Sequence, residues 1–198
     1  GGETTNAPRL AQTGKNAVVD WVLIELRNKN NPTQIVATKA ALLERDGDVV
    51  GTDGYARIIF NVPADQYHVT VRHRNHLAAM TFSPIALNSS EAGLDFTLGS
   101  TPTFGQNARV PLANGAWAQW CGNAQRDGYL RYTGEGNDRD PILLGIGGAV
   151  PTNTVAGYSL LDVNMDGVIR YTGQGNDRDP ILVNVGGNVP TNTRSEQL

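Results

Sequence analysis

The feature that most constrains the fold is a sequence repeat in the C-terminal part of the chain. Residues 131–154 and 170–193 lie 39 positions apart and are identical at 19 of 24 aligned positions. Both copies contain Gly-Asn-Asp-Arg-Asp-Pro-Ile-Leu, then Gly-Gly, then Val-Pro-Thr-Asn-Thr. A repeat of this length is one supersecondary unit, which buries its apolar side against a neighbouring copy. We therefore expect residues 116–198 to form a packed pair of repeats, at about 123–154 and 162–193.

The segment before the second copy has the residue order of an EF-hand calcium loop. Asp162, Asn164 and Asp166 occupy alternate positions, and Gly167 follows them. Side-chain oxygens at alternate positions converge on one ion only if the chain then turns sharply, which a glycine allows by taking a positive φ. The carbonyl oxygen of Val168 is the next expected ligand.

The last carboxylate ligand is displaced from its usual place in this loop. An ordinary EF-hand has a carboxylate at position 12, where this chain has Gly173. If 170–175 is an insertion, Asn176 takes the role of position 9, and Asp177 or Asp179 can complete the site. We expect Asp179 to be the ligand, although Asp177 is also within reach.

A short helix should follow the loop. Asp179 is a suitable N-cap, Pro180 suits the first turn, and glycines 186–187 should end the helix. A calcium loop followed by one helix resembles the type I dockerin repeat, over residues 123–148 and 162–187. The inserted residues and the shorter helices depart from that pattern, so cohesin binding does not follow. The repeats also resemble the C-terminal regions of large secreted bacterial surface proteins.

The first copy has a corresponding but less charged loop. Its candidate ligands are Asn123, Gln125, Asp127, the carbonyl of Tyr129, Asn137, and Asp138 or Asp140. Neutral amides stand at the first and third positions, and affinity for calcium falls with the ligand charge. We therefore predict two Ca²⁺ sites of which the second is tighter. The first would fill only at the millimolar calcium found outside cells, which favours an extracellular or cell-surface location.

The preceding region, 17–98, has the period-two alternation of β-strands. Strand candidates are the segments 18–26, 35–44, 56–62, 67–71, 80–85 and 94–98. Short strands separated by turn residues are typical of an antiparallel sandwich. We therefore predict a mainly β fold: an N-terminal extension (1–16), an antiparallel β-sandwich (17–98), a linker (99–115), and the pair of calcium-loop repeats with short helices.

One stretch of this region resembles a known family. Residues 62–71 read Val-Pro-Ala-Asp-Gln-Tyr-His-Val-Thr-Val. This run is similar to the strand-turn-strand of transthyretin-like and collagen-adhesin B-type sandwiches. The resemblance implies a stalk or adhesion scaffold over about 17–98, and it implies no catalytic role.

Composition excludes several classes of function. The formal net charge is −3, so a nucleic-acid partner is not expected. No segment has the length and apolarity of a membrane span, and the single cysteine, Cys121, excludes an intrachain disulfide. The chain begins Gly-Gly-Glu, as a processed secreted protein would. The serines lie in no nucleophile motif and no phosphate loop is present, so we predict no enzymatic activity.

Two other residue groups have alternative interpretations. His68, His73 and His76 are the only histidines. A zinc site would need a fold-back at Asn75, so we expect surface or turn histidines. Trp117 and Trp120 suit a sugar-binding platform, but we expect them to pack the linker against the repeats.

The expected function is that of a calcium-stabilised structural protein. Its partner would be another copy of the chain, in an extracellular filament, tube or surface array whose neighbouring subunits hold the chain termini. The alternative is an adhesin-like binding module or docking tail of a larger cell-surface protein, with another surface protein or a glycan as partner. A third possibility is an accessory carbohydrate-binding domain of a hydrolase.

Overall fold

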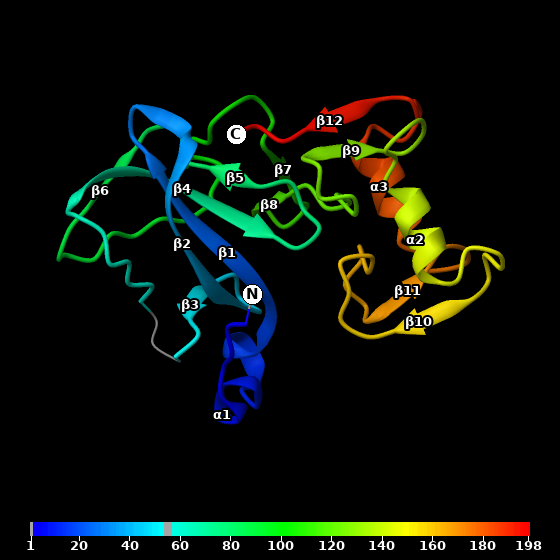
Figure 1. Ribbon diagram of the computed structural model, residues 1–198, viewed down its shortest axis with the longest axis horizontal. Helices are drawn as coiled ribbons and strands as arrows, with labels where there is room; N and C mark the ends of the chain where they lie inside the picture. The colour runs from blue at the N-terminus through cyan, green and yellow to red at the C-terminus, as the bar shows by residue number, and fades with distance from the viewer. Residues whose placement is uncertain (1, 54–56) are drawn as a thin grey trace.

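The computed structural model describes residues 2–53 and 57–198, and it shows a mainly β chain with few helical residues (Figure 1). The main antiparallel sheet has the strand order β3-β2-β1-β4-β5, with β6 also paired to β4. Its strands are β1 (Val18–Asn28), β2 (Asn31–Glu44), β3 (Val49–Gly51), β4 (Asp65–His73), β5 (Ala79–Met80) and β6 (Ile85–Leu87). The predicted mainly β, antiparallel fold is confirmed. A two-sheet sandwich is not, because the other sheets of the described residues are two-stranded.

The central strand β1 shows why the sheet forms. It pairs with β2 on one side and with β4 on the other. Its alternate residues Val22, Ile24 and Leu26 are buried and pack with Tyr67 and Val69 of β4. The period-two alternation of the sequence therefore marks the core-facing side of the sheet, as predicted.

The strand predicted over 56–62 is wrong. Ala56 lies outside the described residues, and residues 57–62 have no strand structure. Ile58, Phe60 and Val62 nevertheless pack against the core of the main sheet. Their alternation reflects which side chains face the sheet, and side-chain burial does not require a hydrogen-bonded ladder.

Two further strand predictions need correction. Residues 94–98 form no strand, because the Asp95 carboxylate accepts hydrogen bonds from the backbone N–H and the hydroxyl of Thr97, which holds a turn there. The predicted strand 80–85 is divided between β5 and β6. Pro84 lies between them and lacks the N–H that a continuous ladder needs.

The predicted linker, 99–115, is packed against the sheet. It contains β7 (Arg109–Pro111), which pairs with β8 (Trp117–Gln119) just beyond it. The N–H of Phe104 donates to the Met80 carbonyl of β5 at 2.9 Å, and the Pro102 carbonyl accepts from the N–H of Phe82 at 3.1 Å. The segment therefore connects the sheet to the repeats through specific contacts.

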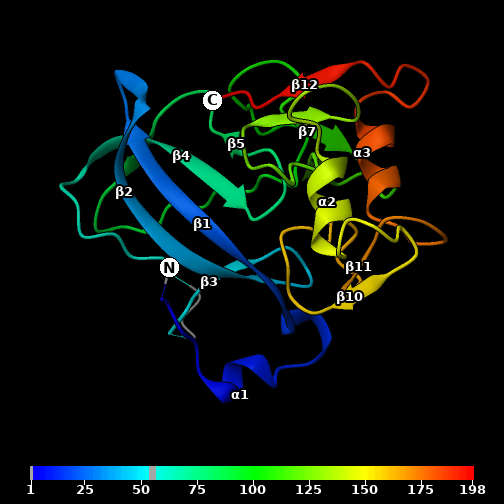
Figure 2. The same cartoon turned by 45° about the vertical axis from the view of Figure 1, so that its right-hand side comes forward.

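The two repeats share one core, and the last strand of each pairs with the loop strand of the other. Figure 2 shows the two helices of the repeats side by side. Their elements are β9 (Tyr129–Arg131), α2 (Arg139–Gly145), β10 (Thr154–Ala156), β11 (Val168–Arg170), α3 (Arg178–Asn184) and β12 (Thr193–Ser195). The last strand of the first repeat, β10, pairs with β11 of the second, and β12 returns to pair with β9. The shared core contains Ile142, Ile146, Val163, Ile169 and Ile181. The expectation that each copy packs on the other is confirmed.

All helices of the described residues are short. Helix α1 (Ala7–Leu10) lies in the N-terminal extension, where Arg9 forms an ion pair with Glu44 of β2, and a 3-10 turn follows at Gly14–Asn16. Helices α2 and α3 have seven residues each. Within the described residues, no helix has the length and apolarity needed to cross a membrane.

Candidate functional site

The second loop curls around its first aspartate. Asp162 accepts a hydrogen bond from the N–H of Asp166 at 3.1 Å and, through its other oxygen, from the N–H of Gly167 at 3.0 Å. Asp166 in turn accepts from the N–H of Val168 at 2.9 Å. Gly167 has φ +85°, as the predicted sharp turn requires, and Met165 also has a positive φ of 60°. The alternating oxygens therefore lie on one tight loop.

Asp177 closes this loop from within. Its carboxylate accepts hydrogen bonds from three backbone N–H groups, those of Val163 (2.7 Å), Asn164 (3.1 Å) and Arg170 (2.7 Å). The side chain is fully buried. Asp177 thus connects the two ends of the predicted insertion. Because its oxygens already accept three hydrogen bonds, they have little capacity to bind a cation as well.

The helix after the loop begins earlier than predicted. Helix α3 starts at Arg178, so Asp179 lies in its first turn and is not the N-cap. Asn176 takes the capping role, because its side-chain oxygen accepts from the N–H groups of Arg178 (3.2 Å) and Asp179 (3.0 Å). The predicted end of the helix is confirmed, since Gly186 and Gly187 follow it with positive φ.

The first loop repeats this construction with different residues. Asn123 accepts from the N–H of Asp127 at 3.2 Å, and Asp127 accepts from the N–H of Tyr129 at 2.9 Å. Asp138 accepts from the N–H groups of Gln125 (3.0 Å) and Arg131 (2.8 Å). Asn137 and Asp140 form the same side-chain pair at 2.8 Å as Asn176 and Asp179 do. Both candidate sites therefore have the same framework of hydrogen bonds.

An arginine lies beside the fifth position of each loop. Arg131 Nη1 lies 2.6 Å from Asp127 Oδ2, and Arg170 pairs with Asp166 in the same way. One oxygen of each of these exposed carboxylates therefore already faces a positive charge. Ion pairs of this exposed i, i+4 type contribute little stability, so a bound cation can displace the arginine at small cost.

The described carboxylates do not gather tightly at the predicted sites. Among residues 2–53 and 57–198, Glu44, Asp46 and Asp48 are the one group of at least three Asp, Glu, His or Cys whose ligand atoms all lie within 4.8 Å of one another. Glu44 is paired with Arg9, and Asp46 accepts from the N–H of Asp48 across a turn. This group therefore has a structural explanation, and the calcium assignment of the repeat loops stays a prediction.

Burial affects the two loop-closing carboxylates strongly. Loss of solvent raises the pKa of Asp138 to about 6, and burial also raises the pKa of Asp177. Hydrogen bonds from backbone N–H groups offset only part of this effect, and the nearby carboxylates Asp127 and Asp162 add to it. Within the described part of the chain, no basic side chain forms an ion pair with Asp138 or Asp177. Each loop thus holds a buried negative charge without a cationic partner.

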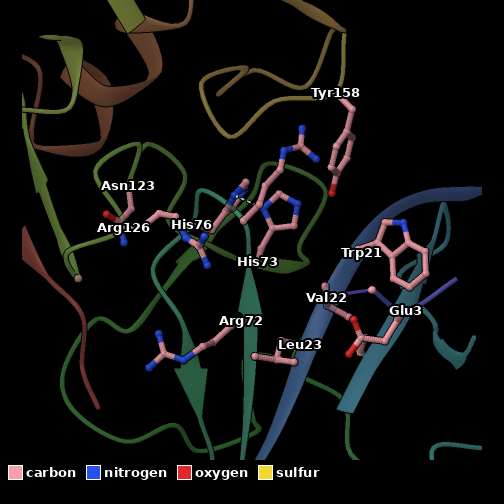
Figure 3. Close-up of a pocket in the computed structure, with 14 residues that line it drawn as sticks. Glu3, Trp21, Val22, Leu23, Arg72, His73, His76, Asn123, Arg126 and Tyr158 are labelled. Carbon is pink, nitrogen blue, oxygen red and sulfur yellow. Dashed lines mark hydrogen bonds between the residues drawn. The ribbon is translucent and has the colours of Figure 1, made fainter. Parts of the chain in front are cut away.

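A polar cluster around the buried Asp20 joins the sheet to the start of the second loop. Figure 3 shows three of its members, His73, His76 and the exposed Tyr158. Asp20 of β1 accepts from the Tyr158 hydroxyl at 2.7 Å and pairs with Arg74. His73 Nε2 lies 2.9 Å from Asp20 Oδ2, although its N–H direction is not that of a hydrogen bond. The Nδ1 atoms of His73 and His76 are 2.7 Å apart. Burial alone would raise the pKa of Asp20, but the adjacent His73 ring and the hydrogen bond from the Tyr158 hydroxyl hold that pKa well below its usual range.

The sequence reasoning missed this cluster and expected surface or turn histidines. His68 is buried, and the chain does fold back at Asn75. Burial lowers the pKa of His76 to about 3. A signal was present in β1. Asp20 shares the period-two face of Val22, so its charge falls at a core-facing position and requires partners.

An open pocket of about 410 Å³ lies beside the cluster (Figure 3). Its lining includes Trp21 of β1, Arg72 of β4, Arg74 of the turn after β4, and Arg126 of the first loop. Arg72 is paired with Glu25 and Arg74 with Asp20 and Asp162, so much of the positive charge of the lining is compensated. The lining thus combines polar groups with the aromatic rings of Trp21 and Tyr158.

Trp120 packs the linker against the repeats, as predicted, whereas Trp117 lies against Gly99 and Arg109 within the linker. Trp120 contacts Leu130 and Val185 of the repeats, and its Nε1 donates to the Asn107 carbonyl at 2.8 Å. The Arg194 guanidinium lies 3.5 Å from the centre of a Trp120 ring. Because Arg194 covers one face of the Trp120 ring, this ring does not suit an open sugar-binding platform.

Comparisons of the chain with protein-family models, with curated proteins and with solved structures found no match.

Proposed function

We propose that the chain is a secreted, calcium-stabilised structural protein, the self-assembling subunit of an extracellular filament, tube or surface array. The observation that carries the calcium part is the pair of fully buried carboxylates, Asp138 and Asp177, which lack a cationic partner among the described residues. A buried charge is costly unless an opposite charge lies nearby. A divalent cation within each loop would supply that charge, in a site that exists only in the folded state.

In the second loop the ligands would be Asp162, Asn164, Asp166, the carbonyl of Val168, and Asp179. Asp179 is the better final ligand because its side chain is 63% exposed, whereas the oxygens of Asp177 are used by backbone N–H groups. The first loop has Asn123 in place of an aspartate and Gln125 at its third position, so its affinity for calcium would be lower. Millimolar extracellular calcium would fill both.

Thermal unfolding with calcium and with chelator tests the proposal. For a Kd of about 0.1 mM, 5 mM calcium stabilises the folded chain by about 2 kcal/mol per site. At about 2–4 °C per kcal/mol, the melting temperature should rise by roughly 5–15 °C. Asp166→Ala should remove the larger part of this rise and Asp127→Ala the smaller part.

Arg170→Ala is the matched control for Asp166→Ala. Both variants lose the Arg170–Asp166 ion pair, but only Arg170→Ala keeps the carboxylate. Arg170→Ala should therefore retain the calcium response or enlarge it. A melting temperature that is the same with calcium and with chelator would overturn the calcium assignment.

The assembly part has separate support in exposed apolar side chains. Leu144 of α2 and Val183 of α3 occupy equivalent repeat positions and are 75% and 69% exposed. Their equivalence gives the repeat pair two matching apolar contacts for neighbouring subunits. Negative-stain microscopy and light scattering in millimolar calcium test this part, and a monomer at all concentrations refutes it.

The open pocket favours one alternative, an adhesin-like binding module or docking tail. A partner from another surface protein would insert beside Trp21 and Arg126 at the junction of sheet and repeats. This alternative predicts calcium-dependent capture of a different protein by the purified chain. The structural proposal predicts that the chain binds only itself.

A further inference from the structure

The pairing of the repeat strands is reciprocal, and each repeat donates its last strand to the other. Strand β10 follows α2 and pairs with β11, whereas β12 follows α3 and pairs with β9. The registers are equivalent, since Ala156 faces Val168 as Ser195 faces Tyr129. Neither loop strand pairs with the last strand of its own repeat.

The two donated strands differ in how they are connected to their acceptors. Strand β10 reaches β11 through residues 157–167, so the pair is a local hairpin. Strand β12 pairs with β9, whose residues lie more than 60 positions earlier in the chain. The connection between β12 and α3 contains Gly186 and Gly187, both with positive φ. Strand β12 can therefore leave its acceptor without opening a local hairpin, which β10 cannot do.

The segment 193–198 makes its contacts mainly with distant parts of the chain. Glu196 accepts hydrogen bonds from Arg72 (2.9 Å) and from the N–H of Ala78 (2.8 Å), both in the sheet region. Its own N–H donates to the Gly128 carbonyl of the first loop at 2.7 Å. Arg194 stacks on Trp120. A second copy of the chain would offer this segment an identical acceptor.

We propose that β12 and the residues after it exchange between copies, so that the β12 strand of one chain pairs with β9 of the next. This inference rests on the self-assembly in the proposed function and names the surface that performs it. It continues the pattern inside the chain, in which the first repeat donates its strand forward to the second. Exchange of an identical element costs little free energy, because the contacts broken within one chain are remade between chains. Forward donation between successive copies is a head-to-tail contact, which produces an open filament when the rotation between copies does not close into a ring.

Cysteine pairs at equivalent positions test the exchange in the full-length chain. Ser195 and Tyr129 are opposite each other, and the hydrogen bond from Glu196 N–H to the Gly128 carbonyl makes them a non-hydrogen-bonded pair, whose Cβ atoms are close. In a Cys121→Ser background, one preparation carries Tyr129→Cys and another carries Ser195→Cys. The two are mixed at low calcium, brought to 5 mM calcium and oxidised mildly. A disulfide between the two variants can form only between chains.

The internal repeat supplies the matched control. Ala156→Cys and Val168→Cys occupy the corresponding pair in β10 and β11, flanked by the hydrogen bond from Gly157 N–H to the Gly167 carbonyl at 2.9 Å. The exchange predicts covalent dimers about tenfold more abundant in the Tyr129/Ser195 mixture than in this control mixture. Equal yields overturn it. Particles that form in calcium without the disulfide overturn the exchange and leave the proposed function standing, whereas an absence of particles overturns both the exchange and the assembly.

Discussion

Asp177 and Asp179 lie two residues apart, yet substitution should affect the chain in different ways. Asp177→Ala removes a buried carboxylate that accepts three backbone hydrogen bonds, from Val163, Asn164 and Arg170. Asp179→Ala removes an exposed carboxylate whose hydrogen bond comes from the Asn176 side chain. The first change breaks the framework of the loop, and the second removes only a proposed ligand.

The magnitudes follow from these contacts. Each buried N–H that loses its acceptor costs about 1–3 kcal/mol, and water entering the vacated space recovers part of that cost. Asp177→Ala should therefore lower the free energy of unfolding by about 3–5 kcal/mol even in chelator. Asp179→Ala should cost under about 1 kcal/mol in chelator and should abolish most of the stabilisation that calcium adds to the second site.

Urea unfolding followed by tryptophan fluorescence, in 5 mM calcium and in chelator, measures both effects. Asp138→Ala and Asp140→Ala repeat the comparison in the first loop, where the same hydrogen bonds occur. If Asp177→Ala and Asp179→Ala lower stability equally in chelator, Asp177 does not close the loop. If Asp179→Ala keeps the full calcium response, Asp179 is not a ligand.

Two other predictions concern a glycine and a buried acid. In urea unfolding, Gly122→Ala should lower the free energy of unfolding by about 1–3 kcal/mol more than Gly134→Ala does. Both glycines have positive φ, but only at Gly122 would the added Cβ lie 3.0 Å from Ile181 Cγ1. The pKa of Asp138 is raised from 3.8 to about 6, so its contribution to stability is full below pH 4 and is lost as the pH rises through about 6. In chelator, this contribution to the free energy of unfolding should fall by about 1 kcal/mol between pH 5 and pH 7. Asp138→Asn should remove this pH dependence, and the control Asp140→Asn should retain it. An unchanged pH dependence in Asp138→Asn would contradict the assignment of the raised pKa to Asp138.

The features of the repeats that the sequence predicts well are those set by local chemistry. The sharp turn at Gly167 and the end of α3 before Gly186 depend on backbone freedom at single glycines, which a sequence shows directly. The apolar positions Ile142 and Ile181 recur with the repeat and meet in its core. Local rules therefore suffice for the outline of each repeat.

Other features depend on contacts between distant segments and could not be predicted. The exact start of α3 is set by the Asn176 side chain, whereas the sequence alone indicates Asp179 as the cap. The Asp20–Tyr158 contact joins residues 138 positions apart. Alternation over 57–62 cannot distinguish a paired strand from a segment that lies on the sheet with every second side chain buried.

Asn75 provides a physical link between the two loops and the sheet. It is fully buried in the turn after β4. Its side-chain Nδ2 donates to the carbonyls of Leu160 (2.9 Å) and Asp162 (2.8 Å), at the start of the second loop. Its own carbonyl accepts from the N–H groups of Gly122 and Asn123, at the start of the first loop, both at 2.9 Å. Since one residue of the sheet region fixes the first position of both loops, a cation that orders either loop also stabilises the junction with the sheet. Calcium bound in the repeats would therefore stabilise the whole chain.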